Sequence, residues 1–352
     1  MMLAVPIAEG HPAIKVVVSE EQQQRPERRL ILHAPLYIWL SPQLTSSAVE
    51  RVRGPGDGAS GEAWDLAVIV EDDLVAVLLM ILNPCILREA CASTVQELAM
   101  NIMGNTILIT GGTSGIGRAL AEALHAKGNK IIVAGRRQSL LDEVTGRNKG
   151  MVGVAVDLSD TAAVEIFAKK VTAEFPKLNV LINNAGIAGL EDYTAEVVDL
   201  ARANTTIQTN ITSVVQLTAA LLPVLRSQPR STLMVTTSGL AFVPYPPGPV
   251  YSATKAFMHN WLDALREQLR KTSVEVLELA PPYVQTELGG PQQASDPRAM
   301  PLDEFTREVM QILENNTIEK GEVLVERVKP LRWAEKDGKY QEFLNAFASF
   351  HD

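Results

Sequence analysis

The stretch "ILITGGTSGIGRAL" at residues 107–120 passes from an apolar, β-branched run through a glycine-rich loop into a helical pattern. Gly111, Gly115 and Gly117 have the spacing G-x-x-x-G-x-G. Between a strand and a helix, such glycines permit a tight turn, the close approach of a pyrophosphate to the backbone, and packing of the helix on the strand. The free amide groups at the start of the helix then bind the phosphates. The stretch therefore predicts a dinucleotide-binding fold.

From Asn105 onward, short apolar runs alternate with segments of helical periodicity. In the first of these segments, Ile116, Leu120 and Leu124 recur at i, i+4 and i+8 and give one apolar face. Such alternation is typical of βαβ units, so the sequence predicts an α/β fold: a Rossmann-like, doubly wound parallel sheet of about seven strands. The expected strands are 106–110, 130–135, 152–157, 179–184, 232–238, 274–280 and 322–326. The expected helices are 115–127, 138–146, 160–174, 194–225, 250–271 and 302–314.

Residues 1–99 lack this regularity. Five prolines break up residues 1–42, and "RGPGDGASGE" at 53–62 is a glycine-rich stretch typical of a flexible segment. A short strand or helix is expected between Trp64 and Leu98. We therefore predict an irregular N-terminal extension over 1–99, either poorly ordered or the product of a misassigned start, and a nucleotide-binding domain over 100–352.

The composition argues against several classes of protein. The 352 residues are 46% hydrophobic with a net charge of −9, so no nucleic-acid surface is expected, because such a surface needs clustered Lys and Arg. The apolar run Leu74–Leu82 is far shorter than the ~20 residues of a membrane span. Cys85 and Cys91 fit neither a redox motif nor a zinc site, and the five histidines lack metal-ligand spacing, so no metal is expected. Residues 1–15 show no secretory pattern, which favours a cytoplasmic location.

The end of the second expected strand, "AGRR", bears on the choice of cofactor. Dinucleotide-binding folds often carry an acidic residue here, which binds the adenosine ribose 2′-hydroxyl. This chain has Gly135 followed by Arg136 and Arg137. A guanidinium group suits a 2′-phosphate, so Arg136 favours NADP over NAD. The alternative is that both arginines are solvated residues at a helix start, which fits Arg137 better.

The stretch "YSATKAF" at 251–257 places Tyr251 and Lys255 on one helical face, at i and i+4. A nearby ammonium group favours the phenolate, so Lys255 is expected to lower the pKa of Tyr251 and make it a usable proton donor and acceptor. Taken alone, the pair also fits two surface side chains. Ser238 closes the preceding strand, and side chains at that edge of a parallel sheet face the ligand crevice. This position predicts that Ser238 is a reacting group beside Tyr251, although a helix-capping role fits Ser238 as well.

Taken together, the motifs resemble the short-chain dehydrogenase/reductase family. The matching segments follow the family's order and spacing over residues 105–330. The phrases "SGLAFVP" and "ELAPP" are most similar to the branch of oxidoreductases named for D-alanine esterification of teichoic acids. The matching segments are "TGGTSGIG" (110–117), "NNAG" (183–186), "QTNITS" (208–213), Ser238, "YSATK" (251–255) and "PPYVQTEL" (281–288).

The resemblance implies a role for each matching residue. Tyr251 would be the general acid in reduction and the general base in oxidation, and Lys255 would lower its pKa and hold the nicotinamide ribose. Ser238 would polarise the carbonyl. Asn210 would anchor a water that links Lys255 to solvent, the alternative being a buried polar residue that satisfies backbone groups. The implied NADP(H) contacts are Gly111, Thr113, Ser114, Gly115, Ile116, Gly117, Arg136, Asp157, Leu158, Asn184, Ala185, Gly186, Tyr251, Lys255, Val284 and Thr286.

One departure concerns the loop at 281–288. Many family members have Pro-Gly where this chain has Pro281-Pro282, and the second proline stiffens the loop and removes an N–H donor. The expected substrate wall is mainly apolar and predicts a lipophilic small-molecule carbonyl or alcohol. Its residues are Leu190, Leu240, Phe242, Tyr283, Leu288 and Met300.

The sequence thus predicts an NADPH-dependent oxidoreductase, and the resemblance implies a homo-oligomer formed through the fourth and fifth helices. Two alternatives remain open. One is a non-catalytic nucleotide-binding regulator on the same fold. The other is an epimerase or dehydratase that shares the Tyr/Lys pair, although such relatives usually space their glycines differently.

Overall fold

The computed structural model describes residues 102–349 and seven strands in the N-terminal part of the chain. The chain divides into two compact units, Met1–Glu97 and Leu98–Asp352, which are described separately. The larger unit carries every motif discussed above.

The N-terminal unit contains two small antiparallel sheets with the orders β1-β2-β3-β4 and β5-β6-β7. The strand expected after Trp64 is present, and β7 covers most of the apolar run Leu74–Leu82. The five earlier strands were not expected, because prolines and glycines dominate that part of the sequence. That residues 1–99 are poorly ordered or a misassigned start stays a prediction. The strands are β1 (Met2–Ala4), β2 (Lys15–Val17), β3 (Arg28–Leu32), β4 (Leu36–Leu40), β5 (Val49–Arg53), β6 (Asp65–Glu71) and β7 (Leu74–Met80).

The larger unit is built on a seven-stranded sheet with the order β10-β9-β8-β11-β12-β13-β14, in which every strand pair is parallel. This confirms the predicted doubly wound sheet. The order reverses between β8 and β11, and ligands of such sheets bind in the crevice outside the carboxyl ends of the strands at this point. The strands are β8 (Thr106–Thr110), β9 (Lys130–Gly135), β10 (Val152–Ala155), β11 (Val180–Asn183), β12 (Ser231–Thr236), β13 (Val274–Leu279) and β14 (Glu322–Val323).

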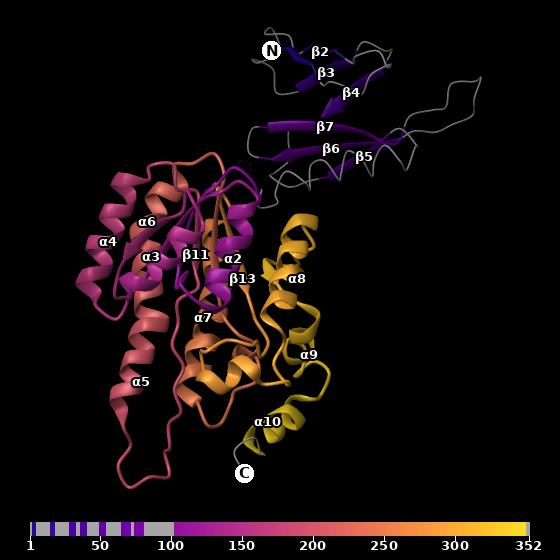
Figure 1. Ribbon diagram of the computed structural model, residues 1–352. Helices are drawn as coiled ribbons and strands as arrows, with labels where there is room; N and C mark the ends of the chain where they lie inside the picture. Colours follow the sequence, from indigo (N-terminus) through magenta and orange to yellow (C-terminus); the bar gives the residue numbers. More distant parts are fainter. Residues whose placement is uncertain are drawn as a thin grey trace. The chain divides into compact units, whose positions relative to one another are not determined.

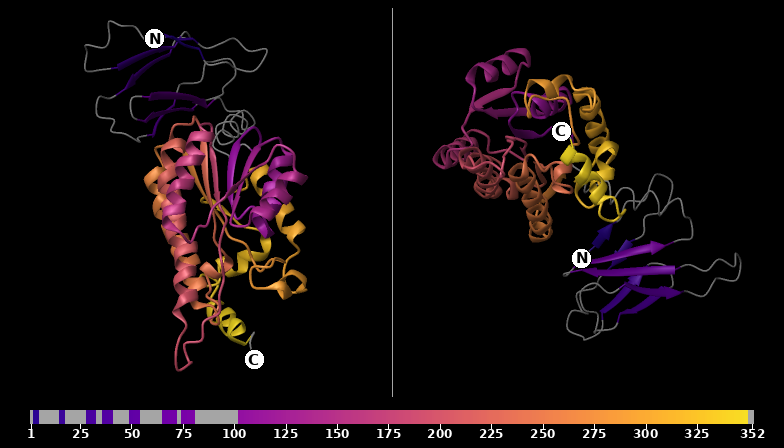
Figure 2. Two further views of the ribbon diagram at one scale, coloured as in Figure 1. Left: turned by 60° about the vertical axis from the view of Figure 1, so that its left-hand side comes forward. Right: turned by 90° about the horizontal axis from the view of Figure 1, so that it is seen from below.

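Helices cover both faces of this sheet (Figures 1 and 2). Successive strand residues point to opposite faces, so Ile107 and Ile109 join one buried cluster and Leu108 the other. The first cluster includes α2, α3 and α8, and the second includes α4, α6 and α7. The short helices α9 and α10 were not expected. The helices are α2 (Gly115–Ala126), α3 (Gln138–Arg147), α4 (Thr161–Glu174), α5 (Leu200–Ile207), α6 (Ser213–Arg226), α7 (Pro249–Leu269), α8 (Leu302–Asn315), α9 (Lys329–Arg332) and α10 (Tyr340–Ala348).

The helix expected at 194–225 is wrong in two respects. It starts later, because Asp199 caps α5 by accepting a hydrogen bond from the amide of Ala201 at 2.9 Å. It is also interrupted by a π-helical turn, Gln208–Thr212, between α5 and α6. Such turns occur frequently at functional sites, and this one contains Asn210.

The combined run Leu200–Arg226 is the one helical segment of the described residues that is long and apolar enough to cross a membrane. Length and composition alone are weak evidence for a span, because the core helix of a globular domain meets the same test. Here Leu217, Leu221 and Leu225 are buried in the cluster on one face of the sheet. The segment therefore packs as a core helix of this domain.

A buried asparagine network fixes the point where the chain enters the domain. The amide of Asn129 donates to the carbonyls of Ile102 at 2.6 Å and Leu124 at 2.7 Å, and its oxygen accepts from the backbone N–H of Asn105 at 2.9 Å. Asn179 donates to the side chain of Asn105 at 2.8 Å. The network ties the segment just before β8 to the start of β9 and β11.

We expect a truncated chain that begins at Met100 to fold and to bind NADPH like the full chain, because it retains Ile102 and the whole asparagine network. Thermal unfolding and a fluorescence titration with NADPH would measure this. A chain that begins at Asn105 is the matched control. It loses the carbonyl of Ile102, and we expect it to be less stable by about 1–3 kcal/mol, the usual cost of an unpaired buried donor. Loss of cooperative unfolding in the Met100 chain would contradict the predicted domain boundary.

Candidate active site

The glycine loop connects β8 to α2 and packs against the "NNAG" segment. Gly111 has a φ of +66° and Gly115 a φ of +51°, both in the left-handed region. A Cβ atom at Gly111 would lie 2.9 Å from the Cα of Ala185. At Gly117, a Cβ atom would overlap the carbonyl of Gly111 and the amide of Asn184. The loop thus accepts only glycine at these two positions, because it packs tightly on the "NNAG" segment and on itself. Such a tight glycine turn between a strand and a helix fits a dinucleotide-binding loop.

The residues between these glycines have different environments. Ser114 is exposed at the N-terminus of α2, where a ligand can reach it, whereas Ile116 is half-buried and packs against the core. Thr113 is buried, and its methyl group would lie 3.0 Å from a Cβ atom built at Gly135. This contact explains why Gly135 stands where many dinucleotide-binding folds have an acidic residue.

Arg136 is exposed directly after β9, near Asp157 at the end of β10. Hydrogen bonds from the backbone and hydroxyl of Ser159, at 2.9 and 2.7 Å, lower the pKa of Asp157, and the charge of Arg136 lowers it further. The structure thus brings together the two residues predicted to contact the adenosine. Leu158 differs, because its side chain is buried in the core and only its backbone can contribute to a ligand site.

Thr110, which the sequence did not single out, connects the glycine loop to the "NNAG" segment. Its hydroxyl accepts hydrogen bonds from the amides of Asn184 and Ala185, both at 3.1 Å. The side chain of Asn184 donates to the carbonyl of Thr110 at 3.2 Å and accepts from the hydroxyl of Thr236 at 3.3 Å. A threonine that ends the strand before a glycine loop is the signal that could have identified this link.

The loop that contains Pro281-Pro282 also reaches the glycine loop. A Cβ atom at Gly115 would lie 3.4 Å from the methyl carbon of Thr286. Gln293 holds this loop by donating to the carbonyl of Val284 at 2.8 Å and to the hydroxyl of Thr286 at 3.2 Å. The second proline therefore leaves Thr286 beside the glycine loop, while Val284 is buried in the core. Gln293 is a supporting residue that the sequence did not reveal.

Ser238 and Tyr251 are neighbours at the carboxyl end of β12. Ser238 accepts a hydrogen bond from the amide of Leu240 at 3.1 Å, so it does cap a short 3₁₀ turn, Gly239–Ala241. Its hydroxyl also lies close enough to Tyr251 to favour the ionised phenol. The capping role of Ser238 is thus present in the structure, and its role as a reacting partner of Tyr251 stays a prediction.

Burial controls the proton affinities of the pair. It raises the pKa of Tyr251 to about 12, and the hydroxyl of Ser238 opposes this shift. Burial lowers the pKa of Lys255 to about 8, and the charge of Glu278 opposes that shift. The ammonium group lies 5.6 Å from the centre of the tyrosine ring. The pKa of Tyr251 is therefore raised overall, whereas the sequence predicted that Lys255 would lower it. Desolvation of the phenolate is the larger effect.

Asn210 and Lys255 lie beside Gly186. A Cβ atom at Gly186 would be 3.3 Å from the side-chain oxygen of Asn210 and 3.6 Å from the Nζ of Lys255. Lys255 donates to the carbonyl of Thr236 at 2.8 Å. Asn210 binds the backbone N–H and carbonyl of Ile187, both at 2.9 Å. Its side chain thus satisfies backbone groups, as the alternative had it, and its role in anchoring a water stays a prediction.

The expected substrate wall is only partly assembled. Leu190, Tyr283 and Leu288 are exposed, but Met300 is buried in the core. Phe242 instead packs edge-to-face on His259, with ring centres 5.0 Å apart. The sequence also missed α10, whose Phe347 lies edge-to-face with Tyr245 at 6.3 Å.

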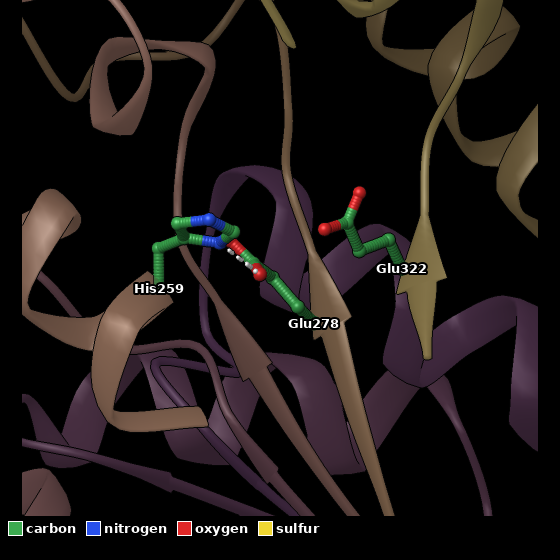
Figure 3. A group of neighbouring side chains, drawn as sticks. All are labelled: His259, Glu278 and Glu322. Atoms are coloured by element: carbon green, nitrogen blue, oxygen red, sulfur yellow. Dashed lines mark hydrogen bonds and ion pairs between the residues drawn. The ribbon is translucent and has the colours of Figure 1, made fainter. Parts of the chain in front are cut away.

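Among the described residues, one group could offer three ligands to a metal ion: His259, Glu278 and Glu322 (Figure 3). Their positions in the sequence gave no metal-ligand spacing. Each carboxylate is already engaged, because Thr237 and His259 bind Glu278, and Arg332 binds both oxygens of Glu322. A metal ion would have to displace the guanidinium group of Arg332.

Comparison with known proteins agrees with this geometry. The family model described as short chain dehydrogenase matches residues 105–296. The chain is 38% identical over 235 residues to an uncharacterized oxidoreductase, DltE, of Bacillus subtilis (strain 168), covering 66% of this chain and 92% of that protein. It is 36% identical over 200 residues to a serine 3-dehydrogenase of Agrobacterium fabrum, covering 55% of this chain and 80% of that protein.

A solved structure shares the architecture. A short-chain dehydrogenase from Sphingobium yanoikuyae in complex with NADPH superimposes with a TM-score of 0.56 at 26% identity, covering 69% of this chain and 95% of that one. The family match extends over the glycine loop, the "NNAG" segment, Ser238, Tyr251 and Lys255. The chain therefore belongs to the short-chain dehydrogenase/reductase family of oxidoreductases.

Proposed function

We propose that the protein transfers a hydride between NADP(H) and a carbonyl or alcohol, with Tyr251 as the general acid and base. The observation that carries this proposal is the placement of Ser238, Tyr251 and Lys255 at the carboxyl end of β12, beside the glycine loop and the "NNAG" segment. In a parallel α/β sheet this edge is where ligands bind.

The chain offers a cradle that fits the cofactor. The backbone at Gly111, Gly115 and Gly117 and the N-terminus of α2 would hold the pyrophosphate. Arg136 would pair with the 2′-phosphate, and Asp157 would contact the adenosine. The "NNAG" segment and the loop with Val284 and Thr286 would border the nicotinamide half. When bound, the nicotinamide supplies or accepts the hydride.

The protein residues then handle the proton and the substrate. Ser238 would hydrogen-bond the substrate oxygen and hold it against Tyr251. Tyr251 would donate its phenolic proton to that oxygen in reduction and take it back in oxidation. The ammonium group of Lys255 would stabilise the phenolate that remains, because an opposite charge favours the ionised form. This role is needed because burial otherwise disfavours the phenolate strongly.

The substrate is proposed to be a lipophilic ketone or aldehyde, or the corresponding alcohol. Leu190, Tyr283 and Leu288 expose large apolar side chains on the loops that follow the "NNAG" segment and β13. The test is an NADPH oxidation assay on a panel of carbonyls that differ in chain length and charge. Turnover of short anionic aldehydes alone would refute the lipophilic substrate, and no turnover of any carbonyl, in either direction, would refute the activity.

We also propose a cytoplasmic homo-oligomer formed through α6 and α7. A shallow apolar depression on these helices is lined by Ile211, Val215 and Phe257, among others. Phe257 is exposed, and an exposed apolar patch of this kind is typical of an interface. Light scattering would detect the oligomer, and a monomer at micromolar concentration would count against it.

Arg136→Ala is expected to weaken NADPH binding by about 10–100-fold, the worth of a hydrogen-bonded charge pair. NADH lacks the 2′-phosphate, so its affinity should change by less than about threefold. The measurement is a fluorescence titration with each cofactor. Arg137→Ala is the matched control, since Arg137 precedes α3, and it should leave the preference intact. Equal losses for both cofactors in Arg136→Ala would refute the assignment.

A further inference from the structure

A chain of buried polar side chains lies behind the reacting residues. The hydroxyl of Thr237 donates to one oxygen of Glu278 at 2.6 Å, and the Nδ1 of His259 lies 2.7 Å from the other oxygen. Figure 3 shows His259 on α7 and Glu278 on β13, with a dashed line between them. Glu278 is fully buried, so it depends on these partners, because an unpaired buried carboxylate is very costly.

A second buried pair closes this cluster on its other side. Arg332 donates to both oxygens of Glu322, at 2.8 and 2.9 Å. The guanidinium group also lies 4.9 Å from the centre of the Phe242 ring, which packs on His259. Glu322 is therefore paired directly with Arg332. The negative charge of Glu278 acts on Arg332 as well as on Lys255 and His259 of α7.

The position of Glu278 links it to both ends of the active site. Thr237 directly precedes Ser238, so its hydrogen bond fixes the strand end that carries the serine. His259 lies one helical turn after Lys255 on the same face of α7. Lys255 in turn donates to the carbonyl of Thr236 at 2.8 Å. One buried carboxylate thus binds both the residue before Ser238 and the residue one helical turn after Lys255.

We infer that Glu278 is a positioning residue that provides a buried counter-charge beside the Thr236 carbonyl to which Lys255 is bound, and that it fixes the strand end at Ser238, with His259 as its hydrogen-bonded partner. The inference rests on the proposed function, because Lys255 and Ser238 have these tasks only in hydride transfer. Glu278 touches neither the substrate nor the cofactor in this account, and it acts through its neighbours.

The charges around Glu278 support this role. Lys255, His259 and Asp263 face the cluster from α7, Glu322 from β14 and Arg332 from α9. The hydrogen bond to Glu278 raises the pKa of His259, although burial lowers it, and Asp263 raises it further. The side chain of His259 is 20% exposed and can exchange its proton with solvent.

In this arrangement, the electrostatic attraction between Glu278 and the Lys255 ammonium group becomes stronger as pH rises through the pKa of His259. Below the pKa of His259, the imidazolium shares the negative charge of Glu278 with Lys255. When His259 loses its proton, the whole charge of Glu278 remains for Lys255, just as rising pH favours loss of the ammonium proton. His259 and Glu278 together thus retain the charge on Lys255 where it is most easily lost.

The test is Glu278→Gln, which keeps a similar shape and one acceptor oxygen but removes the charge. In the full-length protein, we expect the alkaline limb of kcat/KM for NADPH-dependent reduction to move to lower pH by about half a unit or more. At pH 8, kcat should fall about 3–10-fold, with little change in the KM of the carbonyl. An NMR titration of the Lys255 side chain should move in the same direction by a similar amount.

Two variants separate this role from a structural one. Glu275→Gln is the matched control, since Glu275 lies on the same strand and accepts from Thr232 away from Lys255, and it should leave the limb in place. His259→Gln keeps a donor to Glu278 but removes the titrating cation, so the limb should stay or move to higher pH. A limb that moves to lower pH in Glu278→Gln but not in His259→Gln is the signature of the proposed role.

An unchanged NMR titration of Lys255 in Glu278→Gln would overturn the inference. This readout needs no turnover, so it decides on Glu278 even if no carbonyl is reduced and the proposed activity is wrong. A uniform loss of activity at every pH, equal in Glu278→Gln and His259→Gln, would show a purely structural role and would also overturn it.

Discussion

Tyr251→Phe is expected to lower kcat for NADPH-dependent carbonyl reduction by about 10²–10⁴-fold, the usual contribution of a positioned general acid. The substitution removes the phenolic proton and leaves the ring in its buried site. NADPH affinity should stay within about threefold, because the glycine loop and Arg136 are untouched. Steady-state kinetics and a fluorescence titration would measure the two effects separately.

Tyr340→Phe is the control for this experiment, since Tyr340 begins α10 and its hydroxyl has no proposed role. We expect its kcat to match that of the unchanged protein. If Tyr251→Phe retained full activity, Tyr251 would not be the proton donor. If the unchanged protein bound NADPH tightly but reduced no carbonyl, a non-catalytic nucleotide-binding regulator would become the better account of this fold.

Lys255→Met is expected to abolish turnover and to stabilise the folded protein. Turnover should fall by at least about 10²-fold, because the phenolate of Tyr251 loses its counter-charge. The free energy of unfolding should rise by about 1–3 kcal/mol at pH 7, since a buried ammonium group is replaced by an apolar side chain of similar length. Urea unfolding would measure the gain. The stability of the native protein is thus reduced at the residue that the chemistry requires.

The stabilisation by Lys255→Met should depend on pH in a defined direction. The pKa of Lys255 is lowered to about 8 in the folded protein, from an ordinary value of 10.5. As pH falls through 10.5, the unfolded chain takes up a proton that the folded protein does not take up until about pH 8, so the native protein loses stability over this window. The advantage of the Met variant should therefore be full below pH 8 and vanish toward pH 10.5.

Lys169→Met is the control for the stability measurement, because Lys169 is exposed and pairs with Glu165 one turn earlier. Its effect should stay within about 0.5 kcal/mol. A destabilised Lys255→Met would mean that the hydrogen bond to Thr236 and the attraction to Glu278 outweigh the cost of burying the ammonium group.

Local periodicity made most of the larger unit predictable. Six of the seven strands of its sheet fall within the expected segments, and β12 begins one residue earlier than expected. A parallel strand buried on both faces is a short apolar run, which the sequence shows directly. The helices at 115, 138, 160, 250 and 302 begin within one residue of expectation. The glycine loop was equally clear, since left-handed backbone at Gly111 and Gly115 demands glycine. These features depend on a few neighbouring residues, which the sequence displays directly.

What escaped prediction depends on contacts between distant residues. The hydrogen bonds of Thr110 to the "NNAG" segment join residues more than 70 positions apart. Gln293 and Glu278 have no motif, and their importance comes from what lies against them. The π turn at Asn210 inserts into a helical pattern without breaking its apolar spacing. The direction of the pKa of Tyr251 depends on burial, which a Tyr/Lys spacing does not report.

The order of the sheet has a consequence for how the chain is synthesised. β8 lies at the centre and pairs with β9, which follows it closely, and with β11, which comes only after α3, β10 and α4. At ribosomal speeds of about 5–20 residues per second, the second edge of β8 stays open for seconds. That edge belongs to the apolar strand "TILIT", and an open edge of this kind can pair with other chains. The strand that begins the nucleotide site is thus also the segment most exposed to aggregation during synthesis.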